Sequence, residues 1–324
     1  MRSHYRLAHR TRGVFHASNR SLAATSALAL ALITATAADA GQPQEVFATK
    51  AHEFGQSAVN GAIAWAVDRP AEEFTYAIKV KLGAASAFRV NPPKTAAQMG
   101  GLDLGNPLAN VLLAYSRARA IRQKQWDIHL YDVETQMEIP VPAGLNTDSK
   151  REASPTVSGD YLLFERGPQR SPVGTKIVLY QISTTDSTLL ANAPSGGIVQ
   201  AGQVSGDYAT YTVCPRSNRC SVFRYRISDQ QRLRAPDQDR AAYDPSVTNA
   251  GIMFYALGSP RYCGYKTKLM RWDGGGAATT VVRFDNGIEL GPSSAHVEPD
   301  SDEIVHFTRI ACRGFNTDIY KVKV

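Results

Sequence analysis

Asp244 is the carboxylate best placed for chemistry, because it alone lies among the three residues that precede each copy of an internal repeat described below. Glycoside hydrolysis ordinarily requires two carboxyl groups that face each other across the scissile bond. Glu152 and Glu289 are the nearest candidate partners for Asp244. One carboxylate without an evident partner is a weak signal for a hydrolase.

His296 follows Ser293 and Ser294, so a base beside a nucleophile is a second candidate arrangement. Neighbours in sequence do not have the geometry of a catalytic triad, and no G-x-S-x-G turn occurs to expose a nucleophilic serine. We therefore interpret His296 as a structural histidine.

The four cysteines are Cys214, Cys220, Cys263 and Cys312. An even number in an exported chain favours two disulfides, and the spacing places Cys214 and Cys220 across one hairpin loop, with Cys263 and Cys312 as the second pair. Three pairings are open. A zinc site would need four converging ligands, and no C-x₂-C spacing occurs. The acidic run from Glu298 to Glu303 lacks full calcium-loop spacing, so no metal and no cofactor are predicted.

Basic residues are concentrated in five segments, 117–125, 166–176, 214–220, 257–268 and 309–317, which contain fourteen Lys and Arg and no acidic residue. A surface of this kind suits an anionic partner. Aromatic residues there are few, so a stacking platform for nucleic acid is not expected. The residues we predict to bind a partner are Arg117, Arg119, Arg122, Lys124, Arg166, Arg170, Arg216, Arg219, Arg261 and Arg313.

An internal repeat supplies the framework that must position these residues. Val157-Ser158-Gly159-Asp160-Tyr161 returns as Val204-Ser205-Gly206-Asp207-Tyr208, 47 positions later. Looser copies place anchors near residues 59, 108, 157, 204, 247 and 297, separated by 49, 49, 47, 43 and 50 residues. An alternating strand follows each anchor, and a second one follows further downstream.

Repeats of this length with several short strands predict an all-β fold, a six-bladed β-propeller of four-stranded antiparallel blades that spans residues 41–324. The last unit ends after its third strand, so residues 45–49 are expected to add the missing outer strand. The five basic segments join second to third strands and therefore share one face. The turns of the opposite face are rich in Asp and Glu.

Residues 1–40 resemble a cleaved Sec-type signal peptide, with five arginines, an apolar stretch from Leu22 to Ala35 and the small-x-small site Ala38-Asp39-Ala40. Without this segment 31 basic and 28 acidic residues remain, a net charge of +3. A secreted or periplasmic protein without a membrane span after cleavage is predicted, and a monomer is expected.

The repeat is similar to the WD40-like repeat of TolB-type periplasmic propellers, on the pattern Ser154-Pro155-x-Val157-Ser158-Gly159-Asp160-x-Leu162-x-Phe164 and the strand Asp318-Ile319-Tyr320-Lys321-Val322. The Pro-Asp-Gly turn of that family is replaced here by Ser-Gly-Asp. The resemblance implies protein binding in the cell envelope without catalysis.

Together these patterns predict an exported propeller that binds an envelope protein or anionic polymer through its basic face. The alternative is a glycan hydrolase, lyase or lactonase-like enzyme acting at the mouth of the central channel, with Asp244, Glu152 and His296.

Overall fold

The computed structural model describes residues 42–47, 53–68, 76–90, 98–106, 110–118, 125–169, 171, 174–216, 219–236, 241–258, 267–284, 288–290, 296–297, 304–311 and 317–324. All of them lie in the compact unit Ala38–Val324. Within these ranges every regular element is a β-strand, and no helix has the length and apolar character to span a membrane.

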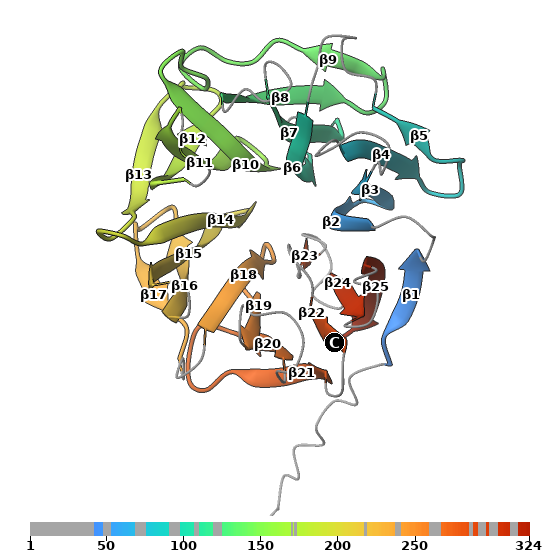
Figure 1. Ribbon diagram of the computed structural model, residues 1–324, viewed down its shortest axis with the longest axis vertical. Coiled ribbons are helices and arrows are strands. Elements are labelled where there is room, and N and C mark those ends of the chain that lie inside the picture. Colours follow the sequence, from blue (N-terminus) through green and yellow to red (C-terminus); the bar gives the residue numbers. More distant parts are fainter. Residues whose placement is uncertain are drawn as a thin grey trace, which may run out of the picture. The chain divides into compact units, whose positions relative to one another are not determined.

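The strands form six antiparallel sheets arranged around a central axis (Figure 1), which confirms the predicted six-bladed propeller. Blade 1 contains β2 (Glu53–Val59), β3 (Ala62–Asp68), β4 (Tyr76–Leu82) and β5 (Phe88–Arg89). Blade 2 contains β6 (Gln98–Gly105), β7 (Leu112–Ala118), β8 (Trp126–Asp132) and β9 (Met137–Ile139). Blade 3 contains β10 (Lys150–Ser158), β11 (Tyr161–Pro168), β12 (Lys176–Gln181) and β13 (Ser187–Asn192).

Blade 4 contains β14 (Ile198–Ser205), β15 (Tyr208–Arg216), β16 (Arg219–Arg226) and β17 (Arg232–Arg234). Blade 5 contains β18 (Ala241–Val247), β19 (Met253–Gly258), β20 (Thr267–Trp272) and β21 (Thr279–Phe284). Blade 6 contains β22 (Ile288–Leu290) and β23 (His296–Val297), which both pair with β24 (Ile304–Ala311), and then β25 (Thr317–Lys323).

The outer strand of blade 6 comes from the other end of the chain. β1 (Gln44–Phe47) pairs antiparallel with β25, with Gln44 opposite Lys321 and Phe47 opposite Ile319. This confirms the predicted closure by the N-terminal strand, although Ala48 and Thr49 fall outside the described residues. Phe47 stacks on Trp65 of blade 1 with ring centroids 4.2 Å apart, so β1 connects the last blade to the first.

The core lies between the blades. Each pair of neighbouring blades packs an apolar cluster of its own, such as Ile78 and Val80 of blade 1 against Leu104 and Leu113 of blade 2. Each blade therefore buries apolar side chains on both of its faces.

The Ser-Gly-Asp repeat has a structural role. Gly159 and Gly206 have φ angles of 52° and 53°, in the left-handed region that a tight hairpin turn requires. Asp160 accepts a hydrogen bond from the Ser183 backbone N–H at 2.8 Å, and Asp207 accepts the equivalent bond from Ser228 at 2.8 Å. In blades 3 and 4 the repeated aspartate therefore connects the first turn to the turn between the third and fourth strands.

Candidate functional site

A cavity of about 190 Å³ lies within the ring of inner strands. Its wall comes from β2, β6, β10, β14 and β18, the inner strands of blades 1 to 5, together with Ala66 of β3 and Glu165 of β11. The pairing of each inner strand with its neighbour is interrupted by a β-bulge at the level of the cavity. The residues at these bulges are Gly55, Gly101, Ser154, Gly202 and Asp244.

The bulges explain why a hollow forms there. Gly55, Gly101, Ser154 and Asp244 have φ angles of 59°, 52°, 52° and 49°, a conformation that bends each strand locally. For Ser154 and Asp244 this left-handed backbone is strained, since both carry a Cβ. Bulges and strained residues are common beside binding sites, so the cavity is one candidate site.

The three predicted catalytic residues are distributed over different surroundings. Asp244 lines the cavity. Glu152 is fully buried and is not part of the cavity wall; its Oε1 accepts hydrogen bonds from Arg166 Nε at 2.9 Å and Thr147 Oγ1 at 3.0 Å. His296 lies in β23, where its backbone is in register with His306, and its side chain is outside the described part of the structure. Glu152 is thus engaged in an ion pair rather than directed at Asp244.

Glu165 is an acidic residue of the cavity wall that the sequence did not reveal. It is buried, its Oε2 lies 3.7 Å from Arg151 Nη1, and its Oε1 accepts a 3.4 Å hydrogen bond from the Ala201 N–H. Burial raises its pKa, while Arg151 and the hydrogen bonds lower it. Glu165 belongs to the second strand of blade 3, whereas the predicted catalytic acids were confined to residues close to the repeat anchors.

Asp103 was missed for a different reason. The inner strand of blade 2 ends at Gly105, three residues before the anchor predicted at 108, so Asp103 does not lie among the three residues that precede that anchor. Asp103 lines the cavity and is 2% exposed. Alignment of the bulges, rather than of the valine anchors, would have found it.

Asp103 belongs to a series of hydrogen bonds that runs from blade to blade around the cavity. In each bond a side chain of one inner strand accepts a backbone N–H of the next. The bonds are Ser57 to Leu104 at 2.8 Å, Asp103 to Val157 at 2.8 Å, Thr156 to Val204 at 3.1 Å and Gln203 to Val247 at 3.1 Å. Three of these acceptors are neutral, and Asp103 is the ionisable one.

Two residues of the predicted basic face are already paired within the protein. Arg117, 13% exposed, forms an ion pair with Glu138, which also accepts a hydrogen bond from Tyr115. Burial raises the pKa of Glu138, but hydrogen bonds from His129 and Tyr115 and the charge of Arg117 lower it to about 2. Arg166 is the partner of Glu152. Each of these two guanidinium groups pairs with an acidic residue of its own blade, in addition to any role at the surface.

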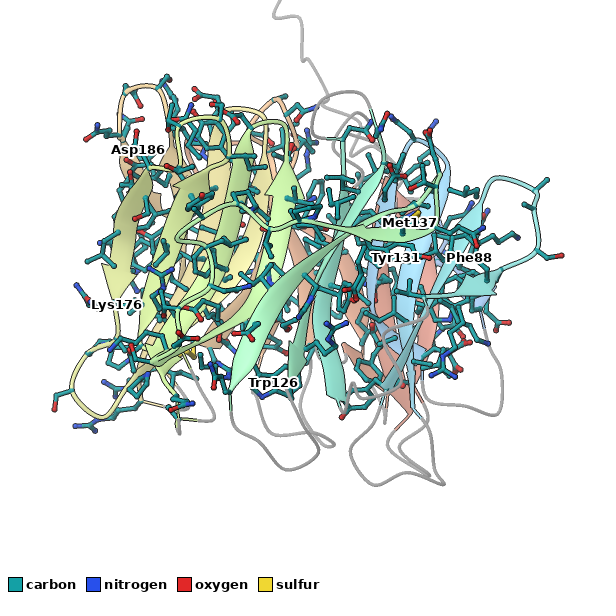
Figure 2. All side chains as sticks on the ribbon, turned by 90° about the horizontal axis from the view of Figure 1, so that it is seen from above. Phe88, Trp126, Tyr131, Met137, Lys176 and Asp186 are labelled. Atoms are coloured by element: carbon teal, nitrogen blue, oxygen red, sulfur yellow. A yellow bond between two sulfur atoms is a disulfide. The ribbon has the colours of Figure 1, made fainter. Side chains whose placement is uncertain are left out.

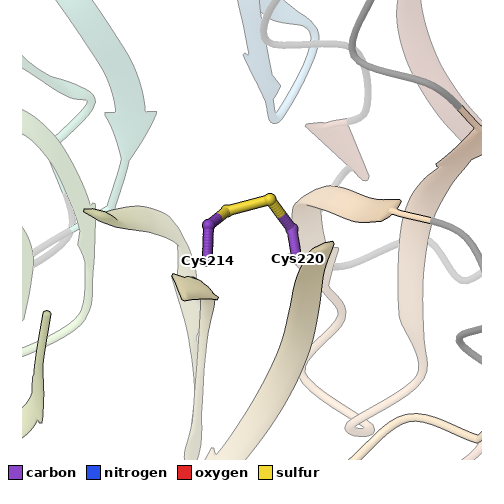
Figure 3. The surroundings of a disulfide bond; sticks show 2 residues. All are labelled: Cys214 and Cys220. Atoms are coloured by element: carbon purple, nitrogen blue, oxygen red, sulfur yellow. A yellow bond between two sulfur atoms is a disulfide. The ribbon is translucent and has the colours of Figure 1, made fainter. Parts of the chain in front are cut away.

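Arg216 and Arg219 are the exposed members of the predicted set. They lie opposite each other across the tip of the β15–β16 hairpin, which the predicted disulfide between Cys214 and Cys220 closes (Figure 3). Lys176, at the start of β12, is also exposed (Figure 2). Arg119, Arg122, Lys124, Arg170, Arg261, Arg313, Cys263 and Cys312 lie outside the described residues.

Acidic residues of the described turns have partners close by in the chain. Many acidic residues of the turns act as local caps: Asp132 accepts bonds from the N–H groups of Glu134 and Thr135 at 2.9 Å. Asp229 pairs with Arg226 at 3.0 Å. On the predicted basic face, the crossover from blade 2 to blade 3 carries the exposed Asp148.

Comparison with solved structures supports the fold. The chain is similar to TolB from Acinetobacter baumannii (TM-score 0.52, 16% identity), covering 82% of this chain and 64% of that one. It is also similar to putative TolB from Agrobacterium tumefaciens (TM-score 0.56, 14% identity), covering 86% and 92%. The β-propeller domain of the Trilobed protease from Pyrococcus furiosus matches with a TM-score of 0.50 and 12% identity, covering 85% and 94%. No protein-family model and no curated relative matches the sequence. The predicted likeness to TolB-type propellers is confirmed at the level of fold.

Proposed function

We propose that this protein is an exported, non-catalytic propeller that binds an acidic protein or an anionic polymer of the cell envelope. The observation that carries the proposal is the tip of the β15–β16 hairpin, where Arg216 and Arg219 are exposed and in direct cross-strand register. Within the predicted basic face, this hairpin tip is the contact that the proposal assigns to the partner.

Like charges directly opposite each other on neighbouring strands destabilise a hairpin. Here the disulfide between Cys214 and Cys220 lies next to the arginine pair and holds the strands together, with both cysteines buried. Strands held by a disulfide lose less conformational entropy on binding than free strands would, and two guanidinium groups can bind a carboxylate or phosphate in a bidentate manner. An anionic group between the two arginines would remove their repulsion.

Export is supported by the signal-like residues 1–40 and by the disulfide, which persists in oxidising compartments. The fold shared with TolB-type propellers is consistent with a protein partner in the envelope. A monomeric mature chain is part of the proposal.

The test is retention of envelope material on immobilised residues 41–324, eluted along a salt gradient. Arg216→Glu with Arg219→Glu is the test variant, because neither arginine belongs to a described ion pair and reversal should leave stability nearly unchanged. Lys176→Glu is the matched control, since Lys176 is exposed but lies on blade 3.

Loss of a salt-sensitive partner in the double variant, with retention by Lys176→Glu, would support the hairpin tip as the contact. If the double variant and Lys176→Glu lose the partner equally, binding belongs to the basic face as a whole and the hairpin tip has no special role. Equal retention by wild type and double variant would refute the proposal.

An enzymatic alternative rests on one observation, the presence of Asp244 and Glu165 on the wall of the same cavity. Glycan hydrolysis ordinarily requires two carboxyl groups at one site. Lyase and lactonase chemistry are related alternatives. Turnover of a glycan or lactone that is abolished by Asp244→Asn but unchanged by the Arg216/Arg219 variant would favour this alternative.

A further inference from the structure

Asp103 connects three blades through one carboxyl group. Its Oδ1 accepts a 2.6 Å hydrogen bond from Ser57 Oγ of blade 1, and its Oδ2 accepts a 2.8 Å bond from the Val157 N–H of blade 3. Ser57 Oγ in turn accepts a 2.8 Å bond from the N–H of Leu104, the residue after Asp103. The carboxyl group therefore lies at the meeting point of blades 1, 2 and 3.

The corresponding positions in the neighbouring blades show what the fold requires there. Ser57, Thr156 and Gln203 make the equivalent bonds with neutral side chains. A hydrogen-bond acceptor is thus sufficient for the architecture. A buried carboxylate adds an electrostatic cost that a neutral acceptor avoids, so its presence suggests a role beyond packing.

We propose that Asp103 is a proton-controlled joint, whose gain or loss of one proton changes the strength of the contact among blades 1, 2 and 3 and the charge of the cavity wall.

Both protonation states are compatible with the observed geometry. In the charged form, both oxygens accept hydrogen bonds. In the neutral form, Oδ1 carries the proton and donates a hydrogen bond to Ser57 Oγ, while Oδ2 still accepts a hydrogen bond from the Val157 N–H. The Ser57 hydroxyl then turns its own proton away from Asp103. The proton can therefore enter or leave without separating the blades.

Several charged and titratable groups lie on the strands around Asp103. Burial raises the pKa of Asp103 to about 7, opposed by the hydrogen bonds from Ser57, Val157 and Leu104. Glu165, which shares the cavity wall, pairs with Arg151. The charged groups on the strands packed against β6 are Glu53 on β2, Asp68 on β3, Lys79 and Lys81 on β4, Arg117 on β7, and Lys150, Arg151 and Glu152 on β10. The titratable tyrosines on these strands are Tyr76 on β4 and Tyr115 on β7.

The sign of the effect follows from the raised pKa. Between the unfolded value of 3.8 and about 7, the folded protein holds a proton that the unfolded chain has released. The stability that this proton confers is fully present below pH 3.8, and it is lost as pH rises towards 7. One such group changes the folding equilibrium constant by about tenfold per pH unit, on the order of a thousandfold over the window.

Asp103→Asn is the decisive variant, because its amide imitates the neutral acid: the carbonyl accepts from Val157 and the NH₂ donates to Ser57. We would measure urea unfolding of residues 41–324 between pH 4 and pH 8. Relative to Asp103→Asn, wild type should lose about tenfold in the folding constant per pH unit up to pH 7 and then level off. Thr156→Val removes the equivalent hydrogen bond between blades 3 and 4, in which the acceptor is neutral. The stability that this variant loses should therefore not depend on pH.

If the ratio of the folding equilibrium constants of wild type and Asp103→Asn is constant from pH 4 to pH 8, the proposal is overturned. If the Asp103→Asn variant does not fold, an NMR titration of the wild-type protein tests the proposal instead. The Asp103 carboxyl ¹³C shift and the amide shifts of Val157 and Leu104 should change together with a midpoint near pH 7. A midpoint below pH 5 would show that the buried carboxyl stays charged and would refute the joint.

Discussion

Replacement of Phe47 by alanine tests whether the N-terminal strand closes the propeller energetically as well as geometrically. Phe47 is partly buried and stacks on Trp65 with centroids 4.2 Å apart, beside the fully buried Ile319. A buried Phe→Ala change costs about 3–5 kcal/mol. Because Phe47 is only partly buried, we take about half of that, and loss of the aromatic pair adds ~1 kcal/mol. We expect Phe47→Ala to lower the free energy of unfolding by about 3 kcal/mol.

The assay is urea unfolding of residues 41–324, followed by circular dichroism and by tryptophan fluorescence, to which Trp65 contributes. Amide exchange in β25 should accelerate in the same variant, because β1 covers that strand. Leu189→Ala is the control, since Leu189 is 48% exposed on the outer strand β13 and its loss should cost less than ~0.5 kcal/mol. If Phe47→Ala and Leu189→Ala have equal free energies of unfolding, β1 pairs with blade 6 without stabilising the propeller, and the prediction is refuted.

Three further perturbations follow from the contacts. Arg166→Met leaves Glu152 buried without its ion-pair partner and should lower the free energy of unfolding by about 3 kcal/mol at neutral pH, measured by urea unfolding. The Arg166→Met, Glu152→Met double variant should recover stability, whereas additive losses of stability would contradict the pairing. Serine at both Cys214 and Cys220 opens a short loop and should cost about 2 kcal/mol, which thermal unfolding with and without reductant can check; an unchanged midpoint would argue against the bond. Gly105→Ala would bring a Cβ into the Val157 carbonyl oxygen, so a marked loss of soluble folded protein is expected, whereas a wild-type midpoint would disprove this close approach.

The fold could be predicted because its signals are local and repeated. A Ser-Gly-Asp turn followed by an apolar strand is visible in the sequence, and its return after 47 residues identifies the blade as the unit. The hairpin disulfide was accessible for the same reason, because Cys214 and Cys220 are six residues apart and flank one loop. Closure by β1 followed from counting strands in the last unit.

The candidate site could be predicted only in part. Asp244 was found because its position before the anchor repeats in every unit, and it does line the cavity. The joint at Asp103 involves Ser57 and Val157, which are 46 and 54 residues away, and no local pattern links them. Likewise, sequence could not distinguish the paired Arg117 and Arg166 from the exposed Arg216 and Arg219.

By itself, the sequence determined the architecture, since turn geometry and strand alternation act over a few residues and the repeat multiplies them. Only the tertiary structure decided which charges are buried, paired or exposed. The reason is physical: the inner strands approach one another when the ring closes, and that approach removes water from Asp103, Glu152 and Glu165 while it leaves Arg216 and Arg219 in solvent. Burial and pairing set the chemistry of these groups. Burial arises where the blades meet, and pairing arises between strands of one blade that are separated along the chain.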